Sequence, residues 1–79
     1  MLSVEIRGPV SSGKTPAAHA LKRQCEKMDK KVFMSDQWLY SFEKSFKNKL
    51  KEDRDYAKSN GYDVCILVIG DLPIDNYPN

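Results

Sequence analysis

Hydrophobic and polar positions change their period along the chain, and each change marks a predicted element. Residues 2–7 alternate between apolar and polar side chains, as in a strand with one buried face. Residues 14–29 instead place apolar side chains three or four positions apart, which predicts a helix. Its apolar positions are Ala17, Ala18, Leu21, Cys25 and Met28. A short apolar run over 32–34 then predicts a second strand.

The second half of the chain continues this alternation of strands and helices. Ser35 or Asp36 can cap a second helix, which we expect to continue to about Ser59. Asn60-Gly61 follows and supplies a left-handed stop. Residues 64–69 are apolar without interruption, which is typical of a strand buried on both faces.

The order strand–helix–strand–helix–strand predicts one α/β domain over residues 1–79, with a three-stranded parallel sheet. Parallel crossovers are right-handed almost without exception. In the strand order 2-3-1 the two helices therefore lie on opposite faces and cover both sides of the strand over 64–69. In the order 1-2-3 they would share one face and leave that apolar strand half exposed. We predict order 2-3-1, with one face of the first strand uncovered.

Composition adds limits on the function class. The chain has 79 residues, of which 41% are hydrophobic and 30% charged, and its net charge of +2 is too small to indicate nucleic-acid binding by itself. Cys25 and Cys65 lack metal-ligand spacing and lie in apolar patterns, so we expect reduced thiols in the core. No apolar run reaches membrane-spanning length and no signal peptide precedes the first strand, which predicts a cytoplasmic protein without a membrane partner.

The strongest chemical signal is the pattern G-x-x-x-x-G-K-T from Gly8 to Thr15, between the first strand and the first helix. This is the spacing of a phosphate-binding P-loop, in which backbone N–H groups surround an anion. The Lys14 ammonium would neutralise the β- and γ-phosphates, and the Thr15 hydroxyl would hold Mg²⁺. Pro16 removes one N–H from the first helical turn, so we expect reduced nucleotide affinity rather than its loss. The residues expected to bind the phosphates are Gly8, Ser11, Ser12, Gly13, Lys14 and Thr15.

Two acidic residues are candidates to complete this site. Asp71 follows the strand over 64–69, and order 2-3-1 places it beside the loop. It would hold Mg²⁺ through a water or orient an attacking water; a simple turn aspartate is an equally weighted alternative. Asp36 ends the second predicted strand on the same side, and capping of the following helix is the role we favour for it.

On the motif from Gly8 to Thr15, and on the strand–helix order around it, the chain resembles the P-loop NTPase superfamily and within it the nucleotide-kinase-like branch. Similar short P-loop proteins occur in bacteriophages, which would place this one in the host cytoplasm. The resemblance implies binding of ATP or GTP with Mg²⁺, and either weak NTPase activity or assembly-dependent phosphoryl transfer. It also implies catalytic roles for Lys14 and Asp71, and contact of Asp36 with the substrate. The further strands, lid arginines and base-recognition loop of full members are missing, so catalysis would need a partner or a second copy.

The second predicted helix carries two stripes that bear on partners. Its apolar stripe comprises Leu39, Phe42, Phe46, Leu50 and Ala57. Its basic stripe comprises Lys44, Lys47, Lys51, Arg54 and Lys58. We favour a solvated face for the basic stripe, with an acidic protein or nucleic acid as alternatives.

A second functional hypothesis is therefore a non-catalytic interaction protein, for example a phage-encoded modulator of a host enzyme. It would act through the uncovered face of the first strand or through the basic stripe. Because the first strand is also an unprotected sheet edge, we predict a homo-oligomer formed there.

Overall fold

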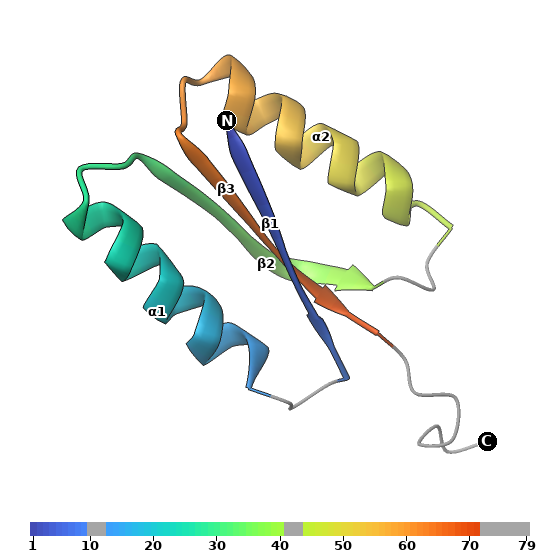
Figure 1. Cartoon of the computed structure of the whole chain (residues 1–79). Coiled ribbons are helices and arrows are strands. Elements are labelled where there is room, and N and C mark those ends of the chain that lie inside the picture. Colours follow the sequence, from blue (N-terminus) through green and yellow to red (C-terminus); the bar gives the residue numbers. More distant parts are fainter. Residues whose placement is uncertain (10–12, 41–43, 72–79) are drawn as a thin grey trace.

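The computed structural model describes residues 1–9, 13–40 and 44–71, with the side chains of 37–40 excepted (Figure 1). The elements in chain order are β1 (Leu2–Gly8), α1 (Lys14–Lys27), β2 (Val32–Tyr40), α2 (Phe46–Ser59) and β3 (Val64–Gly70). The strands are parallel and lie in the order β1-β3-β2, and the helices flank the sheet on opposite sides (Figure 1). The predicted α/β class and the order 2-3-1 are confirmed. Neither described helix is long and apolar enough to cross a membrane.

The core is built on β3, in which every residue is buried. Its side chains alternate between the two faces, so each face forms its own apolar cluster. The cluster under α2 contains Leu50, Ala57, Cys65, Leu67 and Ile69. The cluster under α1 contains Ala18, Val32, Val64, Ile66 and Val68. Both faces of the central strand are covered, as its uninterrupted apolar sequence predicts.

The predicted boundary between the second strand and the second helix is wrong. Residues 35–40 continue β2, whose Tyr40 still pairs with Gly70, and α2 begins at Phe46 after Ser45 as its N-cap residue. Asp36 therefore lies within a strand and does not cap a helix. The physical reason is tertiary, because the side chains of Ser35 and Asp36 form hydrogen bonds with the two helices instead of capping α2. The Ser35 hydroxyl donates to Asp53 Oδ2 on α2 at 2.8 Å, and Asp36 accepts a hydrogen bond from α1.

This shift shortens the predicted apolar stripe of the second helix. Leu39 lies in β2, and Phe42 is outside the described residues. Phe46, Leu50 and Ala57 remain, and all three pack against β3 in the cluster under α2. The predicted helical spacing is therefore confirmed for these three residues.

The carboxyl ends of both helices are explained by their backbone hydrogen bonds and backbone conformation. The first helix ends at Lys27, two residues before the predicted end, because the Met28 and Asp29 N–H groups bond back to Cys25 and Glu26 oxygens in tight turns. Gly61 follows α2 with φ of 73°, the left-handed stop that the sequence predicts.

The thiols are free, as predicted, and differ in burial. Cys65 is completely buried in β3, while Cys25 is half-buried against the cluster under α1. Burial raises the pKa of the Cys65 thiol above its ordinary value, and the nearby Asp53 carboxylate adds to the increase. Cys65 is thus held as a neutral, core-filling side chain.

The two faces of β1 differ in chemistry. Ile6 packs in the cluster under α1, and the alternation of a strand puts Leu2 and Val4 on the same side. Ser3, Glu5 and Arg7 face the α2 side and are all exposed, which agrees with the uncovered face that the sequence predicts for this strand.

Two arginine side chains lie across that exposed face. Arg54 on α2 donates from Nε to Ser3 Oγ at 3.3 Å and forms an ion pair with Glu5. The Arg7 guanidinium lies 5.6 Å from the centre of the Phe46 ring. The polar face of β1 is therefore bridged to α2 by hydrogen bonds and charge rather than by apolar packing.

Candidate functional site

The carboxyl ends of the three parallel strands meet at one edge of the sheet. Gly8 pairs with Gly70 there, and the Asp71 N–H donates to the Gly8 oxygen at 2.9 Å. The G-x-x-x-x-G-K-T motif leaves β1 at Gly8 and enters α1 at Lys14, so it occupies the strand–loop–helix position that phosphate binding requires. Residues 10–12 are outside the described residues, and the phosphate-binding roles of Ser11 and Ser12 stay predictions.

The described end of the loop is set by Gly13. Its φ of 84° and ψ of 18° are left-handed, a conformation that glycine adopts without the steric cost of a Cβ. The Ala17 N–H donates to the Gly13 oxygen at 3.2 Å and begins the helical ladder. The second motif glycine is therefore needed for the turn from loop into helix.

Lys14 reaches back over the loop. Its Nζ donates to the Pro9 oxygen at 2.6 Å, five residues earlier in the chain. The ammonium thus lies near the start of the loop, while the backbone of Lys14 belongs to the first turn of α1. A helix start carries unpaired N–H groups and a partial positive charge, so the lysine adds a full charge where an anion is already favoured.

Thr15 and Asp36 form a side-chain pair that links α1 to β2. The Thr15 hydroxyl donates to Asp36 Oδ1 at 3.2 Å. Both atoms are oxygens, the type of metal ligand that Mg²⁺ prefers. In phosphate sites Mg²⁺ usually binds only one or two protein carboxylates, and phosphates and water supply its other ligands. The residues present fit a magnesium ion. Among the residues that the structure describes, no group of three or more His, Cys, Asp or Glu side chains could hold a metal.

Asp71 is joined to the loop by its backbone but directs its carboxylate elsewhere. Arg7 Nη1 lies 3.6 Å from Asp71 Oδ1, and Arg7 Nε also donates to Glu5 Oε1 at 3.1 Å. Arg7 belongs to the α2 side of β1, whereas the Thr15–Asp36 pair lies on the α1 side. Among the described contacts, Thr15 therefore pairs with Asp36. The predicted metal site pairs Thr15 with Asp71 instead.

The Arg7–Asp71 contact is a weak restraint. Both side chains are close to half exposed, with 45% and 40% of their surface accessible. An exposed pair of this kind stabilises a fold by about 0–1 kcal/mol. The Asp71 carboxylate can exchange this partner at little cost, so its predicted role near the phosphates stays a prediction.

Sequence reasoning underestimated Asp36 because it placed the end of the second strand too early. A signal was present, since Trp38 and Tyr40, two and four positions after Asp36, are strong strand formers. The Arg7–Asp71 contact carried no such signal, because it depends on the register between β1 and β3.

No protein-family model, curated protein or solved structure matches this chain. Support for a function therefore comes from its own residues and their geometry.

Proposed function

We propose that this protein binds a nucleoside triphosphate, ATP or GTP, together with Mg²⁺ through the segment from Gly8 to Thr15. The observation that carries the proposal is the position of the complete G-x-x-x-x-G-K-T motif. It connects the carboxyl end of β1 directly to the first turn of α1, with Lys14 and Thr15 at the helix start.

Each described side chain has a defined task in this proposal. Lys14 exchanges the neutral Pro9 oxygen for the charged β- and γ-phosphate oxygens, which makes a stronger, charge-assisted hydrogen bond. Thr15 and Asp36 would hold Mg²⁺, which when bound neutralises the phosphates. Asp71 would act on the attacking water.

Hydrolysis by the chain alone is expected to be slow. Phosphoryl transfer needs cations that neutralise the transition state. Arg7 and Arg54 lie on the α2 side of the sheet, whereas Thr15 and Asp36 meet on the α1 side. Faster turnover would need a cation from a partner or a second copy.

The test is calorimetric titration of the wild type and of Asp36→Asn with ATP and GTP, once with Mg²⁺ and once with EDTA. Wild type should bind in a saturable manner. Asp36→Asn should weaken binding of the magnesium complex by about tenfold, corresponding to one charge-assisted contact. With EDTA its affinity should equal or exceed that of the wild type, because a negative charge near the phosphates is gone.

Asp55→Asn is the matched control, since Asp55 is an exposed acid on α2. It should leave both titrations unchanged. A loss in Asp36→Asn that is the same with and without Mg²⁺ would contradict the metal role of this side chain. Absence of nucleotide binding by the wild type would remove the proposed function.

Replacing Pro16 with serine is expected to raise nucleotide affinity. Pro16 lies exposed in the first turn of α1 and has no N–H to offer an anion. One restored N–H that bonds a phosphate is worth about 1.5 kcal/mol, or about tenfold in affinity. The thermal midpoint should fall slightly, because proline also restricts the unfolded chain by about 0.4–1 kcal/mol.

Pro16→Ala separates the backbone effect from the new hydroxyl. It also restores the N–H and should reproduce most of the gain, as measured by the same titration. An affinity gain for serine but none for alanine would assign the effect to the side chain instead.

A further inference from the structure

The outer edge of β1 is a regular and unprotected strand edge. All seven residues of β1 pair with β3 without a register shift, and β3 is its only partner among the described strands. The Leu2 N–H donates to the Asp63 oxygen, and the Gly8 oxygen accepts from the Asp71 N–H, so even-numbered residues direct their backbone groups to β3. The N–H and C=O groups of Ser3, Glu5 and Arg7 therefore point to the open side.

The opposite edge of the sheet differs. The pairing of β2 with β3 shifts register between Ser35 and Leu39, and such irregularities make an edge a poor template for another strand. Strand addition is thus favoured at β1 over β2.

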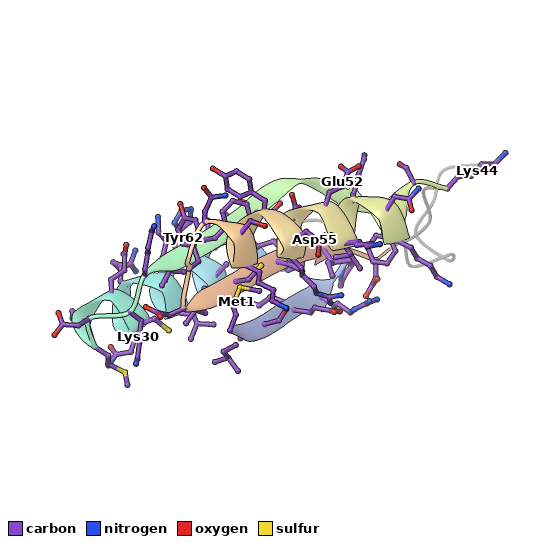
Figure 2. All side chains as sticks on the ribbon, turned by 90° about the horizontal axis from the view of Figure 1, so that it is seen from above. Met1, Lys30, Lys44, Glu52, Asp55 and Tyr62 are labelled. Atoms are coloured by element: carbon purple, nitrogen blue, oxygen red, sulfur yellow. The ribbon has the colours of Figure 1, made fainter. Side chains whose placement is uncertain are left out.

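A cationic arc lies along this edge on the α2 side. It consists of Lys47, Lys51, Arg54 and Lys58, spaced three or four positions apart on one side of the helix. Arg54 contacts Ser3 and Glu5, which places the arc on the flank of α2 nearest β1. Glu52 projects from the other flank of α2 (Figure 2). Asp55 is exposed, lies one turn from both Lys51 and Lys58, and so borders the arc on the side away from the sheet.

The α1 side of the same edge is apolar. Leu2 is 61% exposed, and Val4 and Ile6 are half-buried on this side. A hollow of about 380 Å³ opens beside Leu2 and is lined in part by Met28 and Cys25 of the α1 end. One edge strand thus presents a basic surface above the sheet and an apolar surface below it.

We propose that the outer edge of β1 binds an extended segment of a partner protein as an additional strand, and that this segment alternates acidic and apolar residues. An added strand lies about 4.8 Å beyond β1, with successive side chains on opposite faces. Its acidic side chains meet the cationic arc, and its apolar side chains cover Leu2 and Val4. This binding does not depend on the nucleotide site.

The charges favour such a partner over a second copy of the chain. In an antiparallel β1–β1 dimer the two-fold axis is perpendicular to the sheet, so both α2 helices lie on the same face. The two cationic arcs would then face each other, and opposed like charges disfavour an interface. The edge-to-edge homo-oligomer predicted from the sequence is therefore the competing outcome of the test.

The test uses a fluorescent ten-residue peptide that alternates glutamate and valine, titrated with the full chain and followed by anisotropy. A peptide that alternates lysine and valine is the matched probe. We expect the acidic peptide to bind in a saturable, salt-sensitive manner and the basic peptide not to bind. In ¹⁵N-labelled protein the amide signals of Ser3, Glu5 and Arg7 should shift on binding.

Two pairs of variants separate the backbone from the charge. Ser3→Pro removes an outward N–H without touching the ladder to β3 and should weaken binding at least tenfold, whereas Ser3→Ala should not. The double variant Lys47→Glu, Lys51→Glu should also lose at least tenfold. Its control carries the same charge change at exposed positions of α1, in Arg23→Glu and Lys27→Glu, and should change binding less than twofold.

Other results would overturn the inference. Amide shifts confined to residues outside β1, or equal binding by Ser3→Pro and Ser3→Ala, would exclude strand addition. Preferential binding of a ten-nucleotide single-stranded DNA, independent of Ser3→Pro, would assign the arc to nucleic acid. A dimer mass in light scattering that Ser3→Pro halves would assign the edge to a second copy. Nucleotide titration of Ser3→Pro should match the wild type, so failure here is distinguishable from failure of the nucleotide proposal.

Discussion

Lys14→Ala is expected to lower affinity for magnesium nucleotide at least a hundredfold while leaving the fold intact. The ammonium is proposed to contact two charged phosphate oxygens, and hydrogen bonds to charged groups contribute about 1.5–3 kcal/mol each. Two such contacts amount to at least about 3 kcal/mol, or more than a hundredfold. In the protein itself Lys14 makes an exposed hydrogen bond to Pro9, so its loss should lower stability by no more than about 1 kcal/mol.

Calorimetric titration and thermal unfolding, performed on the same samples, check both parts of this expectation. Lys27→Ala is the matched control, because Lys27 is an exposed lysine in the last turn of the same helix. It should bind nucleotide as the wild type does. Nucleotide binding that survives in Lys14→Ala would show that the loop is not the site, even if the protein binds nucleotide elsewhere.

Leu67→Ala is expected to have the largest effect on stability, a loss of about 2–5 kcal/mol in the free energy of unfolding. Leu67 is completely buried at the centre of β3 and lies in one cluster with Leu50 and Ala57 of α2. A cavity there cannot close easily, because the strand pairs with neighbours on both sides. Since small domains are stable by only about 5 kcal/mol or little more, this loss removes a large part of the stability and should lower the urea midpoint strongly.

Urea unfolding followed by circular dichroism measures this loss, with Leu2→Ala as the control at an exposed leucine of the same sheet. The control should change stability by less than about 1 kcal/mol. Saturating magnesium nucleotide should restore up to about 2.7 kcal/mol at a hundred times the dissociation constant, because only the folded chain binds it. A Leu67→Ala variant as stable as Leu2→Ala would contradict the central position of β3.

The two proposed sites use different parts of the sheet. The proposed nucleotide site uses the carboxyl ends of the strands and the α1 side, where Thr15 meets Asp36. The proposed strand-addition site uses the outer edge of β1 and the α2 side, where Arg54 meets Glu5. Arg7 is the described residue that contacts both regions, through Asp71 at one end and Glu5 at the other. A partner strand on β1 would therefore lie next to Arg7, which contacts Asp71 beside the loop.

The fold was readable from local pattern because its largest energetic term follows that pattern. An uninterrupted apolar run over 64–69 must be covered on both faces, and right-handed crossovers leave order 2-3-1 as the arrangement that does so. The loop from Gly8 to Thr15 could be placed for the same reason, since an alternating strand precedes it and a helical period follows. These features depend on residues near one another in the chain or on one strand's burial.

Other features depended on contacts between distant segments. Ser35 and Asp36 are good helix caps by local chemistry, yet their side chains bond to Asp53 and Thr15, and β2 continues to Tyr40. A helix cap contributes only about 0.5–2 kcal/mol, so strand pairing together with side-chain partners from other elements outweighs it here.

The amino-acid order of this chain was thus sufficient for its class, its strand order and the position of the G-x-x-x-x-G-K-T motif, because burial and chain handedness allow one solution. Tertiary structure alone decided which acid meets Thr15, which cation meets Asp71 and where the second strand ends. Those outcomes are set by strand register and by weak polar contacts between elements. The residues that form each contact lie far apart in the sequence, so no local pattern of residues predicts them.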